Sequence, residues 1–199
     1  MESKTIDYYN QVAKSYVENT INVNFSERQN KFIDLLHEDS IILDFGCGSG
    51  RDSKYFIDHG FRVIAVDGSE EMVKLASDYT GLNVIHSSFQ EFEFTENVDA
   101  VWACSSLLHV ESEELAIITT SIYNHLNNDG LIYLSFKYGD FEGFRRGRIF
   151  NDMNEIKFER FMKANNLDKK FSIISDDITS DVRQGRANEK WLNLILRKR

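Results

Sequence analysis

The sequence has no proline and only two cysteines, Cys47 and Cys104, among its 199 residues. Neither cysteine belongs to a Cys-x-x-Cys or Cys/His pattern, so no metal site is indicated, and reduced thiols in a cytoplasmic protein are expected. No apolar run approaches the ~18 residues that a membrane-spanning helix needs. The amino-terminal segment also lacks the apolar stretch of a signal peptide. We therefore expect a cytoplasmic protein that neither spans a membrane nor holds a metal.

Positive charge is scarce as well. The chain has 23 Lys and Arg residues against 32 Asp and Glu residues, a formal net charge of −9. Nucleic-acid binding depends on basic residues that neutralise phosphates, so this balance argues against a nucleic-acid partner. The length and an ordinary hydrophobic content of 42% predict one domain over residues 1–199 with a substantial core.

The pattern along the chain alternates between short apolar runs and helical spacing. We predict strands at residues 40–45, 61–67, 82–88, 98–106, 131–138, 169–175 and 190–198. We predict helices at residues 53–60, 69–81, 111–126 and 152–166, with further helices in the first forty residues and a turn at 127–130. Such alternation is typical of an α/β protein with a mostly parallel sheet and helices on both faces.

Glycine is uncommon, yet three of the 11 glycines alternate in "IILDFGCGSG", at Gly46, Gly48 and Gly50. A glycine-rich turn after a first strand places backbone N–H groups and a helix N-terminus beside a ligand. The spacing is GxGxG, and Arg51 stands where the GxGxxG motif of dinucleotide-binding proteins has its third glycine. A tight turn that binds no ligand is the simpler alternative.

A second feature is Asp67, which ends the next predicted strand 17 residues after Gly50. An acid at this place can accept hydrogen bonds from two ribose hydroxyls, although it could also be an acid that merely precedes the helix opened by Ser69. Together with the glycine turn it indicates an adenosine ligand. The GxGxG spacing favours a cationic amino acid, rather than a diphosphate, at the other end of that ligand.

The segments "LDFGCGSGRD", "VIAVDGS", "VDAVWACSSLLHV" and "LNNDGLIYLSFK" resemble, in order and spacing, the class I S-adenosylmethionine-dependent methyltransferases. Among them the chain looks most like the small-molecule enzymes of the tellurite-resistance type. The resemblance implies a Rossmann-like seven-stranded sheet of order 3-2-1-4-5-7-6 with the last strand antiparallel. It also implies a single methyltransferase domain over residues 1–199, in which residues 1–38 form a helical lid.

The resemblance also implies a site for S-adenosyl-L-methionine, whose product is S-adenosyl-L-homocysteine. The methionine part is expected to meet Asp44, Gly46, Cys47, Gly48 and Gly50, and the ribose Asp67. The adenine is expected beside Gly68, Ser69, Ser88 and Phe89, and the methyl donor beside Cys104 and Ser105, with Tyr9 and Tyr16 reaching in from the lid. Packing is an open alternative for Phe89 and for both tyrosines.

Methyl transfer is an in-line displacement that needs alignment and the exclusion of water, but no metal. His109, in "SSLLHV" after the fourth strand, is the candidate general base because the pKa of a histidine can be tuned near neutrality. It could equally be a histidine that packs or hydrogen-bonds inside a loop.

The acceptor side is predicted from arginines. Residues 136–153 contain Arg145, Arg146 and Arg148 among aromatic residues, and Arg183 and Arg186 precede the last strand. Arginine suits a planar or anionic small molecule, although these arginines could instead pair with the chain's many acids on a solvated loop.

Two functions remain from the sequence. The first is a methyltransferase acting on a small polar or anionic acceptor, and the second is a non-catalytic module that binds S-adenosylmethionine for regulation or interaction. A dinucleotide oxidoreductase ranks third. The oligomeric state is open.

Overall fold

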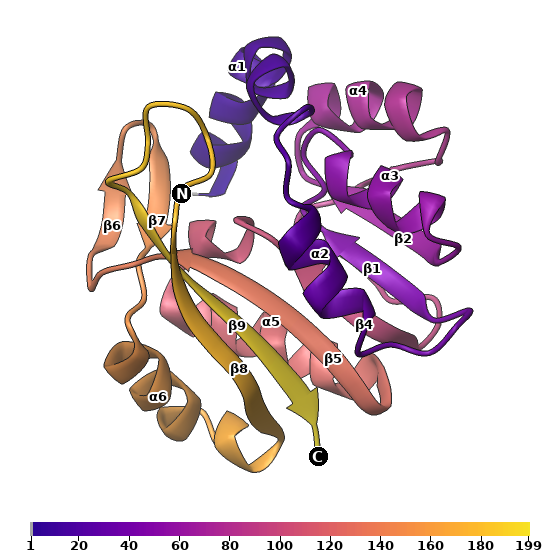
Figure 1. Ribbon diagram of the computed structural model, residues 1–199. Coiled ribbons are helices and arrows are strands. Elements are labelled where there is room, and N and C mark those ends of the chain that lie inside the picture. Colours follow the sequence, from indigo (N-terminus) through magenta and orange to yellow (C-terminus); the bar gives the residue numbers. More distant parts are fainter. Residues whose placement is uncertain (1) are drawn as a thin grey trace.

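A seven-stranded sheet forms the centre of the molecule (Figure 1). The computed structural model describes the backbone from Glu2 to Arg199 and the side chains from Lys4 onward. The strands of the sheet are β1 (Ile41–Phe45), β2 (Arg62–Asp67), β3 (Ile85–His86), β4 (Val98–Ala103), β5 (Leu126–Lys137), β8 (Phe171–Ser180) and β9 (Lys190–Lys198). Their order is β3-β2-β1-β4-β5-β9-β8, and β9 runs antiparallel to both of its neighbours. The predicted Rossmann-like sheet is therefore confirmed.

Helices cover both faces of this sheet, as predicted. They are α1 (Glu2–Thr20), α2 (Ser26–Ile33), α3 (Arg51–Asp58), α4 (Glu70–Thr80), α5 (Ser112–His125) and α6 (Glu155–Ala164), with short 3₁₀ turns η1 (Leu107–His109) and η2 (Leu167–Lys169). On one face, Phe32 of α2 and Phe56 of α3 pack on Trp102 of β4. On the other face, Leu115 of α5 and Phe158 of α6 belong to a second buried cluster.

Helix α4 shows how local sequence sets an element's bounds. The hydroxyl of Ser69 accepts a hydrogen bond from the backbone N–H of Met72 at 3.2 Å, which satisfies one of the free donors at the start of the helix. Gly81 ends the helix with a φ of 78°, in the left-handed region that glycine enters without a steric penalty. Both ends agree with the prediction from the sequence, and the start of α4 is thereby placed at the tip of β2.

A hairpin of β6 (Glu142–Arg145) and β7 (Arg148–Asn151) was not predicted. Its two central residues, Arg146 and Gly147, have φ values of 49° and 80°, as a tight hairpin turn with positive φ at both positions requires. Arginine is a poor indicator of such a turn, because a residue with a Cβ seldom adopts a positive φ. The hairpin lies beside the amino-terminal part of α1 (Figure 1), and Gly147 lies close to the ring of Tyr8.

Two strands differ in extent from the prediction. β3 has only two residues, against the seven expected. β5 begins at Leu126 and includes the expected turn at 127–130 as a bulge, because the pairing with β4 moves from Val98–Leu126 directly to Ala100–Leu131. Asp129 lies in this bulge with a φ of 60°. Between Glu2 and Arg199, no helix is long and apolar enough to cross a membrane.

Candidate functional site

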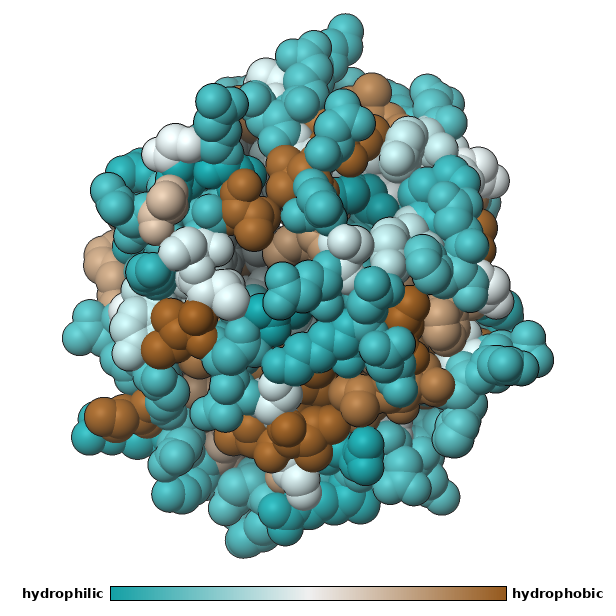
Figure 2. Space-filling view, in the orientation of Figure 1, coloured by the Kyte–Doolittle hydropathy of each residue, from teal (hydrophilic) through white to brown (hydrophobic). Residues whose placement is uncertain are grey.

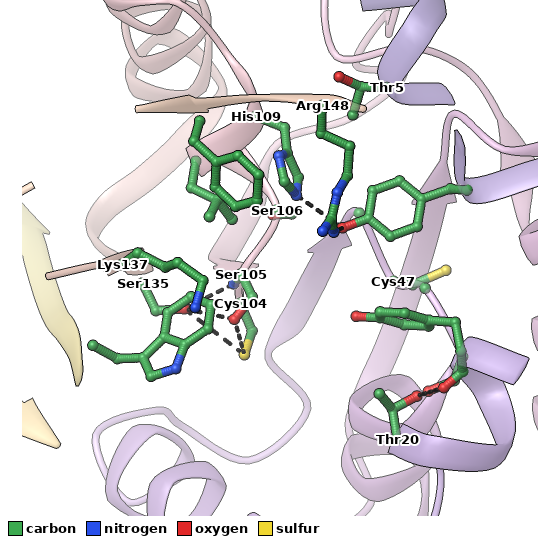
Figure 3. A pocket seen from close by; sticks show the side chains of 18 of the residues that line it. Thr5, Thr20, Cys47, Cys104, Ser105, Ser106, His109, Ser135, Lys137 and Arg148 are labelled. Carbon is green, nitrogen blue, oxygen red and sulfur yellow. Dashed lines mark hydrogen bonds between the residues drawn. The ribbon is translucent and has the colours of Figure 1, made fainter. Parts of the chain in front are cut away.

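A cavity of about 430 Å³ lies where β1, β2, β4 and β5 end. Helix α1, the β6–β7 hairpin and the segment between β8 and β9 supply its other walls. Figure 3 shows His109 and Arg148 on one side of this cavity, and Cys104, Ser105 and Ser135 gathered at the strand ends. In the space-filling view, which has the orientation of Figure 1, hydrophobic residues gather in patches within a largely hydrophilic surface (Figure 2). Ends of parallel strands meet at one edge of a sheet, which is where ligands bind in open α/β folds.

The glycine turn after β1 supplies bare backbone to the cavity. Gly46 and Cys47 both donate their N–H to the carbonyl of Val66 at 2.9 Å, which ties the turn to β2. A Cβ on Gly46 would lie 2.5 Å from the Cβ of Ser106, so no larger residue fits there. A Cβ on Gly48 would meet only the ring of Tyr16, at 3.6 Å, and its φ is 53°. The backbone at Gly48 is therefore open on its cavity side.

Asp67 lies beside this turn at the tip of β2. Its carboxylate accepts the N–H of Gly48 on one oxygen and the N–H of Ser69 on the other, both at 2.8 Å. Burial raises the pKa of Asp67, while these two backbone donors lower it. Among the described residues no Lys or Arg pairs with this carboxylate. Its remaining lone pairs can accept hydrogen bonds from two hydroxyl groups in the cavity.

Helix α1 closes the cavity from above and touches both of its ends. The Asn10 side-chain oxygen accepts a hydrogen bond from the Ser69 hydroxyl at 2.7 Å. Next along the helix, the Tyr9 hydroxyl contacts His109 Nε2 at 2.8 Å and accepts a hydrogen bond from Arg148 Nη1 at 3.0 Å. Tyr16 packs edge-on against Tyr9 with ring centroids 5.5 Å apart. The two tyrosines pack on each other and both line the cavity, and their contact with the cofactor stays a prediction.

His109 has a fixed hydrogen-bonding pattern. Nδ1 lies 2.6 Å from the carbonyl oxygen of Ile149, which can only accept, so Nδ1 carries the hydrogen. Nε2 then accepts the hydrogen of the Tyr9 hydroxyl. Burial, with the nearby positive charges of Arg148, Arg145 and Lys137, lowers the pKa of His109 to about 4. This pKa lies well below neutrality, and the role of His109 as a general base stays a prediction.

The ends of β4 and β5 meet through small polar side chains. The Ser105 N–H donates to the Ser135 hydroxyl at 2.7 Å, and Ser105 has a φ of 55° that turns the chain sharply. The Cys104 sulfur lies 3.9 Å from the hydroxyl oxygens of Ser105 and Ser135. Burial raises the pKa of Cys104 to about 12. Cys104 therefore lines the cavity as a neutral thiol rather than a thiolate.

All five predicted acceptor arginines line the cavity, but most are engaged. Arg145 pairs with Asp152 at 2.7 Å, Arg183 binds Asp181 through Nε at 2.9 Å, and Arg186 lies 3.9 Å from Glu189. The alternative of arginines paired with acids thus describes these three. Arg146 is exposed at the hairpin turn. Arg148 has no carboxylate within ion-pair distance among the residues that the structure describes.

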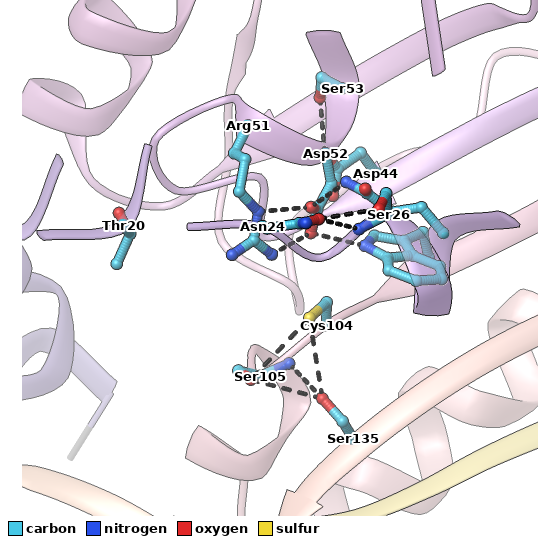
Figure 4. Close-up of polar contacts among 12 residues, drawn as sticks. Thr20, Asn24, Ser26, Asp44, Arg51, Asp52, Ser53, Cys104, Ser105 and Ser135 are labelled. Atoms are coloured by element: carbon cyan, nitrogen blue, oxygen red, sulfur yellow. Dashed lines mark hydrogen bonds and ion pairs between the residues drawn. The ribbon is translucent and has the colours of Figure 1, made fainter. Parts of the chain in front are cut away.

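Two predicted residues, Asp44 and Gly50, do not line the cavity, whereas the other cofactor residues do. The exceptions have structural causes. Asp44 accepts a hydrogen bond from the Ser53 hydroxyl at 2.6 Å and lies behind the cavity wall (Figure 4). A Cβ on Gly50 would lie 2.8 Å from Thr80 Cγ2, so this glycine allows α3 to pack closely on α4. The remaining residues of the predicted cofactor set lie in the lining: Gly46, Cys47, Gly48, Asp67, Gly68, Ser69, Ser88, Phe89, Cys104, Ser105, Tyr9 and Tyr16.

Other lining residues were missed, most clearly Arg51 and Asp52. Arg51 stacks on Phe25, 4.7 Å from the ring centroid, and binds Asp52 through Nε and Nη2 at 2.7 and 2.9 Å. Asp52 also accepts hydrogen bonds from Gln29 and Trp102, both at 2.8 Å (Figure 4). Their position directly after the glycine turn was a usable signal. No signal in the sequence pointed to three other lining residues, because they reach the cavity only through the fold of the sheet: Lys137, Ser135 and Trp191.

The sheet order and the glycine turn agree with the expectation drawn from the resemblance to the class I S-adenosylmethionine-dependent methyltransferases. Residues 42–130 match the family described as a methyltransferase domain. Within residues 42–130 the chain is therefore similar to a methyltransferase domain. No group of three or more His, Cys, Asp or Glu side chains in the described part of the chain could hold a metal ion.

Curated relatives match part of the chain. The chain is 23% identical over 136 residues to an uncharacterized methyltransferase of Alkaliphilus oremlandii. The aligned region covers 64% of this chain and 63% of that protein. The chain is 27% identical over 99 residues to a ubiquinone biosynthesis O-methyltransferase of Rickettsia felis, covering 47% and 40%. The matches thus span between about two fifths and just under two thirds of the length of these relatives.

Solved structures match nearly the whole chain. A Burkholderia thailandensis 1,6-didemethyltoxoflavin-N1-methyltransferase, with bound 1,6-didemethyltoxoflavin and S-adenosylhomocysteine, superposes with a TM-score of 0.73 and 20% identity over 99% of this chain and 86% of that one. TehB from Haemophilus influenzae superposes with a TM-score of 0.69 and 18% identity over 94% and 66%. At these identities the likeness concerns the fold.

The pKa of Asp44 generates a stability prediction. Burial, with the neighbouring Asp52 carboxylate, raises the pKa of Asp44 to about 8, against about 3.9 in an unfolded chain. Between these values the folded state holds the extra proton, so the contribution of Asp44 to the free energy of unfolding decreases as pH rises. Asp44→Asn removes this term. Its stability relative to the wild type should therefore increase between about pH 5 and about pH 8.5 in urea denaturation.

The matched control is Asp58→Asn, which changes an exposed acid at the end of α3 that pairs with Lys54. Its stability offset from the wild type should be constant over the same pH range. An offset for Asp44→Asn that is equally constant would show that Asp44 ionises normally in the folded protein.

Proposed function

We propose that the protein transfers a methyl group from S-adenosyl-L-methionine to a small polar or anionic acceptor. The observation that carries the proposal is Asp67, a partly buried carboxylate that pairs with no Lys or Arg among the described residues and lies beside the open backbone of Gly48. Two ribose hydroxyls would satisfy its free lone pairs, and the bare backbone would admit the rest of the ligand. Solved neighbours that contain S-adenosylhomocysteine support the choice of cofactor.

The residues present fit this cofactor. Asp67 would hold the ribose, with Gly68, Ser69, Ser88 and Phe89 around the adenine. Gly46, Cys47 and Gly48 would contact the methionine part, and Cys104, Ser105, Tyr9 and Tyr16 would surround the sulfonium end. Asp44 and Gly50 would support this site from behind rather than touch the ligand. When bound, S-adenosylmethionine supplies a methyl group on a positively charged sulfur and leaves as S-adenosylhomocysteine.

The chain's own contribution to the reaction would be alignment and exclusion of water. Helix α1 covers the cavity and is held near its middle by two adjacent residues, Asn10 on Ser69 and Tyr9 on His109. A covered cavity keeps water from competing with the acceptor, and an in-line displacement depends on the alignment of the two reactants. In this proposal residues 1–38 act as the lid of a single domain.

The acceptor is proposed from the basic residues of the cavity. Arg145, Arg146, Arg148, Arg183 and Arg186 come from the hairpin and from the segment before β9, and all of them line one opening. Small acceptors are named for the solved and curated relatives, such as the toxoflavin precursor of the Burkholderia enzyme. A cytoplasmic location and the absence of a nucleic-acid partner stay predictions from the sequence.

The first test of this function is cofactor binding after Asp67→Ala. Losing the carboxylate should cost on the order of 1.5–3 kcal/mol of binding free energy, since the ribose hydroxyls lose a charged acceptor. This corresponds to roughly a tenfold to hundredfold rise in the Kd for S-adenosylhomocysteine, measured by calorimetry. Asp58→Asn, outside the cavity, should bind as the wild type does. An unchanged Kd in Asp67→Ala would contradict the placement of the ribose.

The second test concerns His109, which we propose to orient the acceptor through Tyr9, or to take its proton by way of the Tyr9 hydroxyl, whose own hydrogen passes to Nε2. Because burial lowers the pKa of His109 to about 4, the imidazole is neutral above about pH 5. The kcat for release of S-adenosylhomocysteine should therefore not decrease as the pH is lowered through 6.5. His109→Gln should lower kcat by about 10²-fold if His109 is the base. A midpoint near pH 6.5 that disappears in His109→Gln would contradict the buried neutral state.

A further inference from the structure

Among the described residues, neither Arg146 nor Arg148 of the cavity arginines has an anionic partner, and Arg148 is the less exposed of the two. Arg145, Arg183 and Arg186 each have a carboxylate within ion-pair distance, and Arg51 has Asp52. The only hydrogen bond of the Arg148 guanidinium within the described chain is the one from Nη1 to the Tyr9 hydroxyl. Charges that are removed from water are normally paired, because an unpaired charge in a low dielectric is costly. The position of Arg148 is therefore incomplete without an anion.

The surroundings of Arg148 remove water from the faces of its guanidinium. The ring of Tyr8 lies 4.2 Å from the guanidinium carbon, that of Phe150 5.0 Å and that of Tyr9 5.4 Å. Nε is buried and has no hydrogen-bond partner in the described part of the chain. Aromatic rings partly compensate a cation through their faces, but they accept no hydrogen bond in the guanidinium plane. The plane is thus the direction in which an anion would be bound.

The free donors of Arg148 define the shape of that anion. Nη1 uses one hydrogen on Tyr9, whose oxygen is oriented because its own hydrogen goes to His109 Nε2. This leaves the second hydrogen of Nη1 and both hydrogens of Nη2 without a protein acceptor among the described residues. Arg148 lines the cavity, and Figure 3 shows its guanidinium at the opening beside His109. Two coplanar N–H groups match the two oxygens of a carboxylate in a bidentate pair.

We infer that the methyl acceptor is a carboxylic acid and that Arg148 is the residue that selects it, by binding the acceptor's carboxylate between the aromatic rings of Tyr8 and Phe150. This inference rests on the proposed function, since it requires the acceptor to occupy the same cavity as S-adenosylmethionine. The carboxylate is the anchoring group of the acceptor in this account. The flat aromatic surroundings favour an acid whose carboxylate is attached to a planar group.

The experiment uses the full chain saturated with S-adenosylhomocysteine and titrated by calorimetry with benzoate, benzamide and inorganic phosphate. Benzamide has the shape of benzoate without its charge, and phosphate is an anion that is not planar. We expect benzoate to bind at least tenfold more tightly than either of the other two. Arg148→Gln should weaken benzoate at least tenfold and remove its advantage over benzamide, while the Kd for S-adenosylhomocysteine changes less than threefold.

Arg62→Gln is the matched control, because Arg62 lies outside the cavity lining and pairs with Glu96. It should keep the preference for benzoate over benzamide. Equal binding of benzoate and benzamide to the wild type, tighter binding of phosphate, or an unchanged preference in Arg148→Gln would each overturn the inference and leave the proposed function standing. Failure of the wild type to bind S-adenosylhomocysteine would instead contradict the proposed function itself.

Discussion

The carboxylate of Asp67 joins the two turns on which the cavity is built. One of its oxygens holds the N–H of Gly48, after β1, and the other holds the N–H of Ser69, at the start of α4. The carbonyl of Val66, immediately before it, holds the N–H groups of Gly46 and Cys47. The end of β2 thereby fixes the geometry of the turn after β1. These hydrogen bonds keep the open backbone of Gly48 facing the cavity.

Helix α1 contacts the end of β2 and also the residues on the opposite side of the cavity. Asn10 meets Ser69, two residues after Asp67, while the adjacent Tyr9 meets His109 and Arg148. Neighbouring residues on one helix thus contact the part assigned to the cofactor and the part assigned to the acceptor. Because a rigid helix links the two sites, binding of a ligand at one site can affect the other. The helix can thereby help to align the methyl donor with the acceptor.

Much of the fold could be predicted from local sequence, and the outcomes at the site show why more could not. The alternation of strands and helices and the ends of α4 follow from apolar runs, the Ser69 cap and Gly81, whereas the sheet order was expected from the family resemblance. Pairing of Arg145 with Asp152 depends on a hairpin whose turn, Arg146-Gly147, has no common turn sequence. The lowered pKa of His109 and the withdrawal of Asp44 from the cavity arise from burial, which is set by distant segments. Local patterns indicate which residues gather at the strand ends, but not their charge states or partners.

The central claim is that this cavity accepts S-adenosylmethionine, and native mass spectrometry tests it most directly. The purified chain would be mixed with equal concentrations of S-adenosylmethionine, S-adenosylhomocysteine and NADH. This account predicts one-to-one complexes with the masses of the first two ligands and none with NADH, because the turn after β1 has GxGxG spacing and Arg51 in place of a third dinucleotide-motif glycine. A complex with NADH alone, or no complex with either sulfur compound, would contradict it.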